Sequence, residues 1–303
     1  AARGADPAMP GALAGLISID SVPLRQRATT TATAAAGSFD TVEADAHVAA
    51  PVGGGWLAFD AAARRSAGFE TTPDDQRTAF SVPARHRRFS SALSAVVPFG
   101  SGELAARWSS FAGTRTLRFA GADSATEGMD ASIRYAASGQ WPLALTGWVQ
   151  WRDFRNRVVN GQSGRITLDQ RATPSSGWGL RAELRPRLSS AVSLTTGMDW
   201  RASEGVARER AFSGSGQPVA DRAAGGQRAE ALLWLGANTQ HGRLATSLMV
   251  SGQYWQLSGG FRRESRLDGN IGTPDFSFPG RHGWLASGRA GIEWRATDGL
   301  RLF

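Results

Sequence analysis

Residues 227–258 constrain the fold more than any other stretch, because they form two long runs of alternating apolar and polar side chains around a tight turn at 240–242. In the first run Leu233 and Leu235 share one parity, whereas Glu230 and Trp234 share the other. Successive side chains of a strand point to opposite faces, so the pattern predicts a hairpin with one apolar and one polar face. Each arm exceeds the roughly five or six residues usual in soluble strands, and about 9 to 11 residues are needed to cross a bilayer as a tilted strand. The hairpin is therefore typical of a membrane β-barrel.

The same period of two runs along most of the chain, whereas helical periodicity is weak. It predicts strands over residues 28–36, 41–50, 56–65, 87–98, 103–111, 128–138, 141–153, 177–187, 191–204, 227–239, 243–257 and 283–295, with an incomplete strand from 300. No apolar run approaches the roughly 18 residues of a membrane-spanning helix. We therefore expect an all-β chain.

The joins between these strands alternate between tight turns rich in Gly, Ser or Asp and longer polar segments. The longer segments are residues 66–86, 112–127, 154–176, 205–226 and 258–282. Short turns would thus lie at one end of the sheet and long loops at the other. This is the layout of an antiparallel up-and-down transmembrane barrel with short periplasmic turns and long extracellular loops.

Charged residues within the predicted strands fall on one parity. In 128–138, for example, Ile133 and Tyr135 oppose Asp130 and Arg134. An arginine on the lipid face near the bilayer midplane costs about 2 to 4 kcal/mol, so a barrel must keep that face free of charge. A soluble sandwich would also alternate, but with shorter strands and without the need for a charge-free outer face.

Several tryptophans stand near the ends of predicted strands, where an indole can sit at the level of the lipid headgroups. These candidate interface residues are Trp56, Trp141, Trp178, Trp200, Trp284 and Trp294. The alternative is that they end strands without any membrane role, as tryptophans do in many proteins.

The composition argues against catalytic and nucleic-acid functions. The net charge of +8 comes entirely from arginine, and the arginines are spread along the chain among 26 acidic residues rather than gathered as in a nucleic-acid binder. There is no cysteine, and none of the four histidines has a ligand-spaced partner. No phosphate loop, nucleophile elbow or zinc motif is present. We expect no catalytic residues, metal site or cofactor, and hence no enzyme.

Arginine clusters near the predicted loops are the candidate binding residues. They are Arg85, His86 and Arg88 at the end of one loop, Arg155 and Arg157 in another, and Arg262 and Arg263 in a third. Guanidinium groups bind carboxylates and phosphates in a bidentate way. An anionic ligand such as a ferric siderophore, the phosphates of lipopolysaccharide, and solvent alone are three interpretations that the sequence leaves open.

Several segments resemble TonB-dependent outer-membrane receptors. GALAGLISIDS, which begins at Gly11, is similar to the end of their plug domain, and WPLALTGWVQWRDF, VSLTTGMDWRASEG and GWLASGRAGIEWRA are similar to their early and middle barrel strands. The resemblance implies a barrel of 22 strands around an N-terminal plug. On this basis residues 1–24 would be the C-terminal end of the plug and residues 25–303 the N-terminal part of the barrel, with about 13 of the 22 strands. We therefore expect a fragment.

The resemblance also implies a function. Such a receptor lies in the outer membrane of a Gram-negative bacterium, in contact with outer-membrane lipid and lipopolysaccharide. It takes up a scarce ligand, most commonly a ferric siderophore or a similar metal complex, with energy from the TonB complex through a region that precedes this chain. The alternatives are an autotransporter, a porin, or another structural or adhesive outer-membrane barrel.

Overall fold

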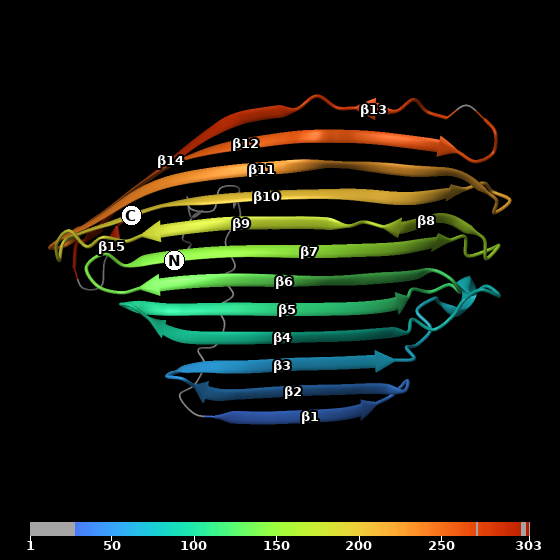
Figure 1. The fold of residues 1–303 in the computed structure, drawn as a ribbon, viewed down its shortest axis with the longest axis horizontal. Coiled ribbons are helices and arrows are strands. Elements are labelled where there is room, and N and C mark those ends of the chain that lie inside the picture. The colour runs from blue at the N-terminus through green and yellow to red at the C-terminus, as the bar shows by residue number, and fades with distance from the viewer. Residues whose placement is uncertain (1–27, 271, 298–300, 303) are drawn as a thin grey trace.

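The computed structural model describes residues 28–270, 272–297 and 301–302, so the predicted plug segment, residues 1–24, lies outside the described residues. The described part is a single antiparallel sheet with one short 3-10 helix, η1 (Asp74–Gln76) (Figure 1). Its strands are β1 (Thr29–Gly37), β2 (Thr41–Val52), β3 (Gly55–Ser66), β4 (His86–Phe99), β5 (Gly102–Thr116), β6 (Asp123–Ala137), β7 (Leu143–Val159), β8 (Ile166–Ala172), β9 (Ser175–Leu184), β10 (Val192–Phe212), β11 (Pro218–His241), β12 (Leu244–Arg266), β13 (Phe276–Ser277), β14 (Arg281–Arg295) and β15 (Arg301–Leu302).

The strands follow one another across the sheet in the order of the sequence and pair antiparallel, which is the up-and-down topology that the sequence predicts. β8 and β9 follow one another in the place between β7 and β10, and β13 and β14 both pair with β12. The described strands thus fill the 13 successive places of the sheet from β1 to β15. This confirms the expectation of a partial barrel of about 13 strands.

The connections differ at the two ends of the sheet (Figure 1). At one end they are tight, as at Gly53 and Gly54, whose positive φ angles of 57° and 82° suit a two-residue hairpin turn. At the other end lie longer connections, of which residues 67–85 form the longest. We call these the short-turn end and the long-loop end. The alternation confirms the predicted layout.

Several strands extend into segments that the sequence pattern predicts as loops. The predicted loop 112–127 contains the ends of β5 and β6, and the predicted loop 154–176 contains the end of β7 and all of β8. The largest differences are in β10, β11 and β12. β10, β11 and β12 have 21, 24 and 23 residues and reach far toward the long-loop end (Figure 1). The predicted loop 205–226 is therefore mostly paired strand, with only residues 213–217 outside it, and the predicted loop 258–282 begins as strand up to Arg266. Cross-strand hydrogen bonds continue here although polar residues occupy both parities.

The two faces of the sheet differ in chemistry, as two adjacent rows of cross-strand partners show. One row contains His47, Asp60, Ala92, Ser109, Asp130 and Gln150. The next contains Val48, Phe59, Leu93, Trp108, Ala131 and Val149. We call the faces that carry these rows the polar face and the apolar face. Apolar side chains of the second row remain exposed, with 43% of Trp108 and 55% of Val149 accessible, so this face needs an apolar environment.

The apolar face is charge-free over a length that matches a bilayer. On β4 its residues run from Phe99 to Phe89 without a charge and then reach Arg87. On β6 and β7 the corresponding runs end at Glu127 and Asp153. The stretch from Phe99 to Phe89 equals the roughly 9 to 11 residues that a tilted strand needs to cross a membrane. Separately, no helix among the described residues is long and apolar enough to span a membrane.

Candidate functional site

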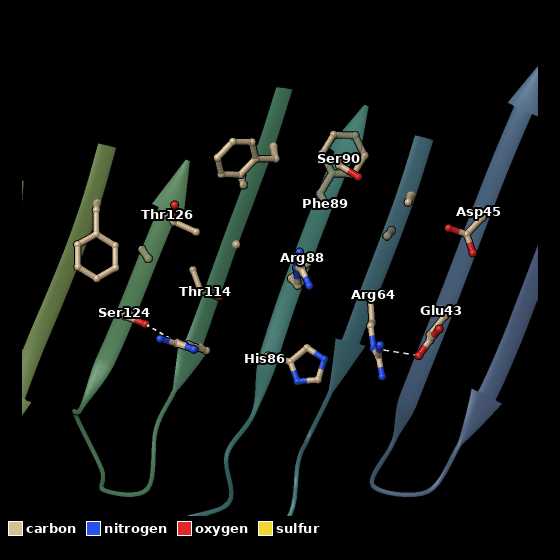
Figure 2. A pocket seen from close by; sticks show the side chains of 18 residues that line it. Glu43, Asp45, Arg64, His86, Arg88, Phe89, Ser90, Thr114, Ser124 and Thr126 are labelled. Atoms are coloured by element: carbon tan, nitrogen blue, oxygen red, sulfur yellow. Dashed lines mark hydrogen bonds and ion pairs between the residues drawn. The ribbon is translucent and has the colours of Figure 1, made fainter. Parts of the chain in front are cut away.

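Four basic residues of the polar face lie close together near the long-loop end. Arg64 of β3 is the direct cross-strand partner of Arg88 of β4, and His86 of β4 is the partner of Arg115 of β5. All four residues share the parity of Asp60 and Ser109 and so project from the polar face. Figure 2 shows Arg64, His86 and Arg88 side by side on two adjacent strands. We call Arg64, His86, Arg88 and Arg115 the basic cluster.

The members of the cluster differ in their partners. The Nε atom of Arg64 lies 2.9 Å from Oε1 of Glu43, and Nε of Arg115 donates a hydrogen bond of 3.0 Å to Oγ of Ser124 (Figure 2). Arg88 has no hydrogen-bond or ion-pair partner among the described residues. Its guanidinium group can therefore bind an anion without first breaking an internal contact.

A hollow of about 680 Å³ lies against the cluster. Besides the four basic residues, it is lined by Glu43, Asp45, Phe89, Ser90, Phe111, Thr114, Ser124, Thr126 and Phe154, with small side chains between them (Figure 2). Its volume is within the usual range of small-molecule sites. The combination of one unpaired arginine, hydroxyl groups and three phenylalanines suits a ligand that is anionic and partly aromatic or apolar.

The long connection 67–85 is fixed to two neighbouring connections. Oγ1 of Thr78 donates a 2.6 Å hydrogen bond to the carbonyl oxygen of Gly161, and the amide of Ala120 donates one of 2.9 Å to the carbonyl oxygen of Phe80. The amide of Val82 donates a third, of 3.1 Å, to the carbonyl oxygen of Arg118. These bonds join three segments that are far apart in sequence. A second hollow of about 780 Å³ includes Arg64, His86, Arg88 and Arg118, so the cluster continues beneath these connections.

The structure distributes the predicted binding residues over both faces. His86 and Arg88 belong to the basic cluster, and Nε of adjacent Arg85 donates a 3.0 Å hydrogen bond to Oγ1 of Thr116. Arg155 and Arg157 lie on β7 on the side of the apolar face, not in a loop as predicted. Arg155 binds Glu127 at 2.8 Å and Asp153 at 3.3 Å, and Arg157 lies 3.8 Å from Asp169.

Arg262 and Arg263 likewise lie on a strand, β12, rather than in a loop. Successive residues point to opposite faces, so the two arginines do not act together. The guanidinium group of Arg263 lies 5.0 Å from the ring centroid of Phe261, as in a cation–π contact. Sequence reasoning missed Arg64 and Arg115, which join His86 and Arg88 only through the register of the sheet.

Beyond the apolar span, the extended strands carry arginines that are already neutralised. The guanidinium group of Arg210 binds Asp221 at 2.6 Å and lowers the pKa of that carboxyl group through these hydrogen bonds. Arg222 donates a 2.8 Å hydrogen bond to Glu264 and lowers the pKa of Glu264 in the same way. Both carboxylates therefore stay charged well into the acid range. Arg88 differs from these arginines because it lacks such a partner.

The candidate interface tryptophans occupy several kinds of position. Trp284 and Trp294 share the apolar face of β14, and Trp284 packs against Tyr254 with ring centroids 5.1 Å apart. Ten residue positions separate the two, which is about 33 Å along the strand. For a strand tilted by about 40°, this corresponds to about 25 Å along the membrane normal, the height of a barrel's apolar band. Trp178 and Trp200 also lie on the apolar face. Trp56, in contrast, shares the parity of Asp60 and lies on the polar face, and Trp141 lies in the connection 138–142.

Within the described part of the chain, no group of three or more His, Asp or Glu side chains is placed to hold a metal ion.

Comparison with solved structures identifies the fold. No family model matches the sequence, and no curated protein matches it. The ferric-catecholate import receptor Fiu from E. coli K12 matches with a TM-score of 0.68 at 11% identity, over 90% of this chain and 53% of Fiu. The copper transporter OprC matches with a TM-score of 0.70 at 16% identity, over 96% of this chain and 46% of OprC. The ferric yersiniabactin uptake receptor FyuA from Yersinia pestis matches with a TM-score of 0.63 at 14% identity, over 91% of this chain and 46% of FyuA.

These proteins are TonB-dependent receptors, and the chain spans about half the length of each. The chain thus has the fold of a TonB-dependent receptor barrel and represents part of such a barrel.

Proposed function

We propose that this chain is part of an outer-membrane receptor that takes up a metal complex with energy supplied through TonB, and that a ferric siderophore is the ligand class. The fold supports this proposal, since similar structures include receptors for ferric catecholate, ferric yersiniabactin and ferric citrate. OprC, a copper transporter, has the same fold, so the fold alone does not select the metal. The chain lies in the outer membrane with its apolar face against lipid.

The basic cluster is the feature that supports an anionic ferric chelate as the ligand. Ferric complexes of catecholate or carboxylate chelators are anionic, and an unpaired guanidinium group on the polar face attracts them. Arg88 would bind the ligand directly, and Arg64 and Arg115 would add positive potential on the neighbouring strands. Phe111 and Phe154 line the same hollow and offer ring faces to an aromatic chelator. A hydrated Cu²⁺ ion would gain nothing from this arrangement.

Uptake of radioactive iron or radioactive copper by cells that carry the complete gene tests this function. Ferric catecholate, ferric citrate and copper(II) serve as probes, in the parent strain and in a strain that lacks TonB. We expect TonB-dependent uptake of at least one ferric chelate. Uptake that persists without TonB would indicate a porin, and the absence of any gene-dependent uptake would overturn the proposal.

The variant Arg88→Gln tests the site itself. Loss of a charge-assisted contact of about 1.5 to 3 kcal/mol raises the concentration for half-maximal uptake by roughly 10-fold or more. Arg134→Gln is the matched control, because Arg134 lies on the polar face near the short-turn end and has no partner among the described residues. Equal effects of the two substitutions would exclude a specific role of Arg88.

A further inference from the structure

Arg65 and Arg87 form an unusual pair on the apolar face. They are direct cross-strand partners on β3 and β4, and both have the parity of Phe59 and Leu93. Neither has a hydrogen-bond or ion-pair partner among the described residues. Like charges directly opposite one another destabilise a sheet. The pair therefore needs a compensating anion from outside the described chain.

Two other arginines on this side of the sheet, Arg155 and Arg210, are already compensated. Arg155 binds Glu127 and Asp153, and Arg210 binds Asp221. The next residue in the row that contains Arg65 and Arg87 is Thr114 of β5, a hydroxyl donor rather than an acid. What distinguishes Arg65 and Arg87 is therefore that two guanidinium groups without a partner among the described residues lie on directly opposite residues. Arg208, which also lacks a partner in the described part of the chain and lies on the same side of the sheet, faces only alanines.

The pair lies at the edge of the charge-free span of the apolar face, which is where the bilayer boundary is expected. Arg87 directly follows the charge-free run of β4 that ends at Phe89, and Arg65 follows Ala63 on β3. At the boundary of a bilayer the lipid headgroups carry phosphate. Two adjacent guanidinium groups offer a phosphate several donors in the fork geometry that favours its oxygens.

A hollow of about 550 Å³ adjoins the pair on the apolar side. Arg65, Arg87 and Thr114 line it together with Ala44, Phe89 and Ala112. The small alanines leave space beside the Phe89 ring, half of which is exposed. Phosphate-binding groups beside an apolar depression suit an amphiphile, with its phosphate at the arginines and an acyl chain on the apolar surface.

We propose that Arg65 and Arg87 bind a phosphate of the lipopolysaccharide in the outer leaflet, with an acyl chain in the adjoining hollow. The inference rests on the proposed outer-membrane location but not on the transported ligand. Lipopolysaccharide is chosen over a free phosphate because the site has an apolar floor, and over an inner-leaflet phospholipid because the pair lies at the long-loop end.

The test uses the complete receptor, purified in a mild detergent, with bound lipopolysaccharide measured by mass spectrometry. We expect the double variant Arg65→Gln and Arg87→Gln to retain at least about 10-fold less lipopolysaccharide than wild type, from the loss of charged hydrogen bonds. Arg208→Gln is the matched control. Arg208 also lies on this side of the sheet without a partner among the described residues, but its cross-strand neighbours are Ala223 and Ala172.

Thermal unfolding with added ligands identifies the source of the phosphate. Intact lipopolysaccharide should raise the unfolding temperature of wild type but not of the double variant, whereas dephosphorylated lipopolysaccharide, phosphatidylglycerol and inorganic phosphate should not. Equal retention by wild type and the double variant, or an equal shift with any of the three control ligands, would overturn the proposal. Iron uptake should persist in the double variant, so a failure of this inference is distinguishable from a failure of the proposed function.

Discussion

Individual glycines show how closely the strands approach one another. A Cβ atom at Gly102 would lie 2.2 Å from the carbonyl oxygen of Ala136, whereas at Gly252 nothing lies within 4 Å. We expect Gly102→Ala to destabilise the folded barrel by about 1 to 3 kcal/mol, because backbone must move. Gly252→Ala, the matched control within a strand, should change stability by less than about 0.5 kcal/mol. Urea unfolding in lipid vesicles measures both free energies of unfolding, and equal stability of the two variants would contradict the close approach of strands β5 and β6 at Gly102.

Asp268 gives a prediction for acid pH. The Arg266 guanidinium group donates hydrogen bonds to this carboxyl group and, with a further contribution from Asn270, lowers its pKa to about 2. The folded pKa is below the unfolded value of about 3.9. The contact therefore contributes fully to the stability of the connection above about pH 4, and this contribution is lost as the pH falls through about 2.

A carbon-13 NMR titration of labelled aspartate checks this value. In the variant Arg266→Gln the pKa of Asp268 should rise toward about 3.9. A wild-type value near 4 would show that the ion pair does not form in solution.

At the scale of the strands, parity predicts which positions tolerate charge. Ile133 is in the middle of the charge-free run on the apolar face of β6, and 53% of its surface is exposed. Ile133→Arg should cost about 2 to 4 kcal/mol and lower the yield of folded barrel in the membrane. Adjacent Ser132→Arg places the same charge on the polar face and should have little effect. The folded fraction is measured from the difference in gel migration between heated and unheated samples. Equal folded yields of Ile133→Arg and Ser132→Arg would show that this face does not contact lipid.

The strands were predictable where one face must avoid charge. From the short-turn end to the membrane boundary, alternation alone defines strands such as β4 and β14 to within a few residues. Beyond the boundary this constraint disappears, and consecutive charges such as Arg208, Glu209 and Arg210 hide the period of two. Register shifts near Gly225 and Ala211 hide it further. The extended parts of β10, β11 and β12 therefore resembled loops in the sequence.

The candidate site was predictable only in part for a related reason. His86 and Arg88 are apparent as a basic run, but Arg64 becomes their neighbour through the pairing of β3 with β4 across the connection 67–85. A connection of this length does not fix the register, unlike a two-residue turn. The sequence thus indicates which residues are basic but not which of them meet.

At the scale of the whole molecule, the extended strands define its orientation. β12 has 23 residues and would span about 76 Å, whereas crossing the bilayer needs about 9 to 11 residues. About half of the strand must therefore project from the membrane. β10 and β11 project beside it, and all three extend at the long-loop end (Figure 1). If the chain functions as a receptor, this end faces the extracellular medium, where the ligand arrives.

Epitope tags at the two ends test this orientation. Gly214 lies in the connection between β10 and β11, and Gly139 lies in the connection between β6 and β7 at the short-turn end. A Cβ atom at either position would meet nothing within 4 Å, so both sites have room for an insertion. We expect antibodies to bind the tag at Gly214 on intact cells and the tag at Gly139 only after the outer membrane is permeabilised. The reverse pattern would place the basic cluster and the Arg65–Arg87 pair on the periplasmic side, and both proposed ligands would then be wrong.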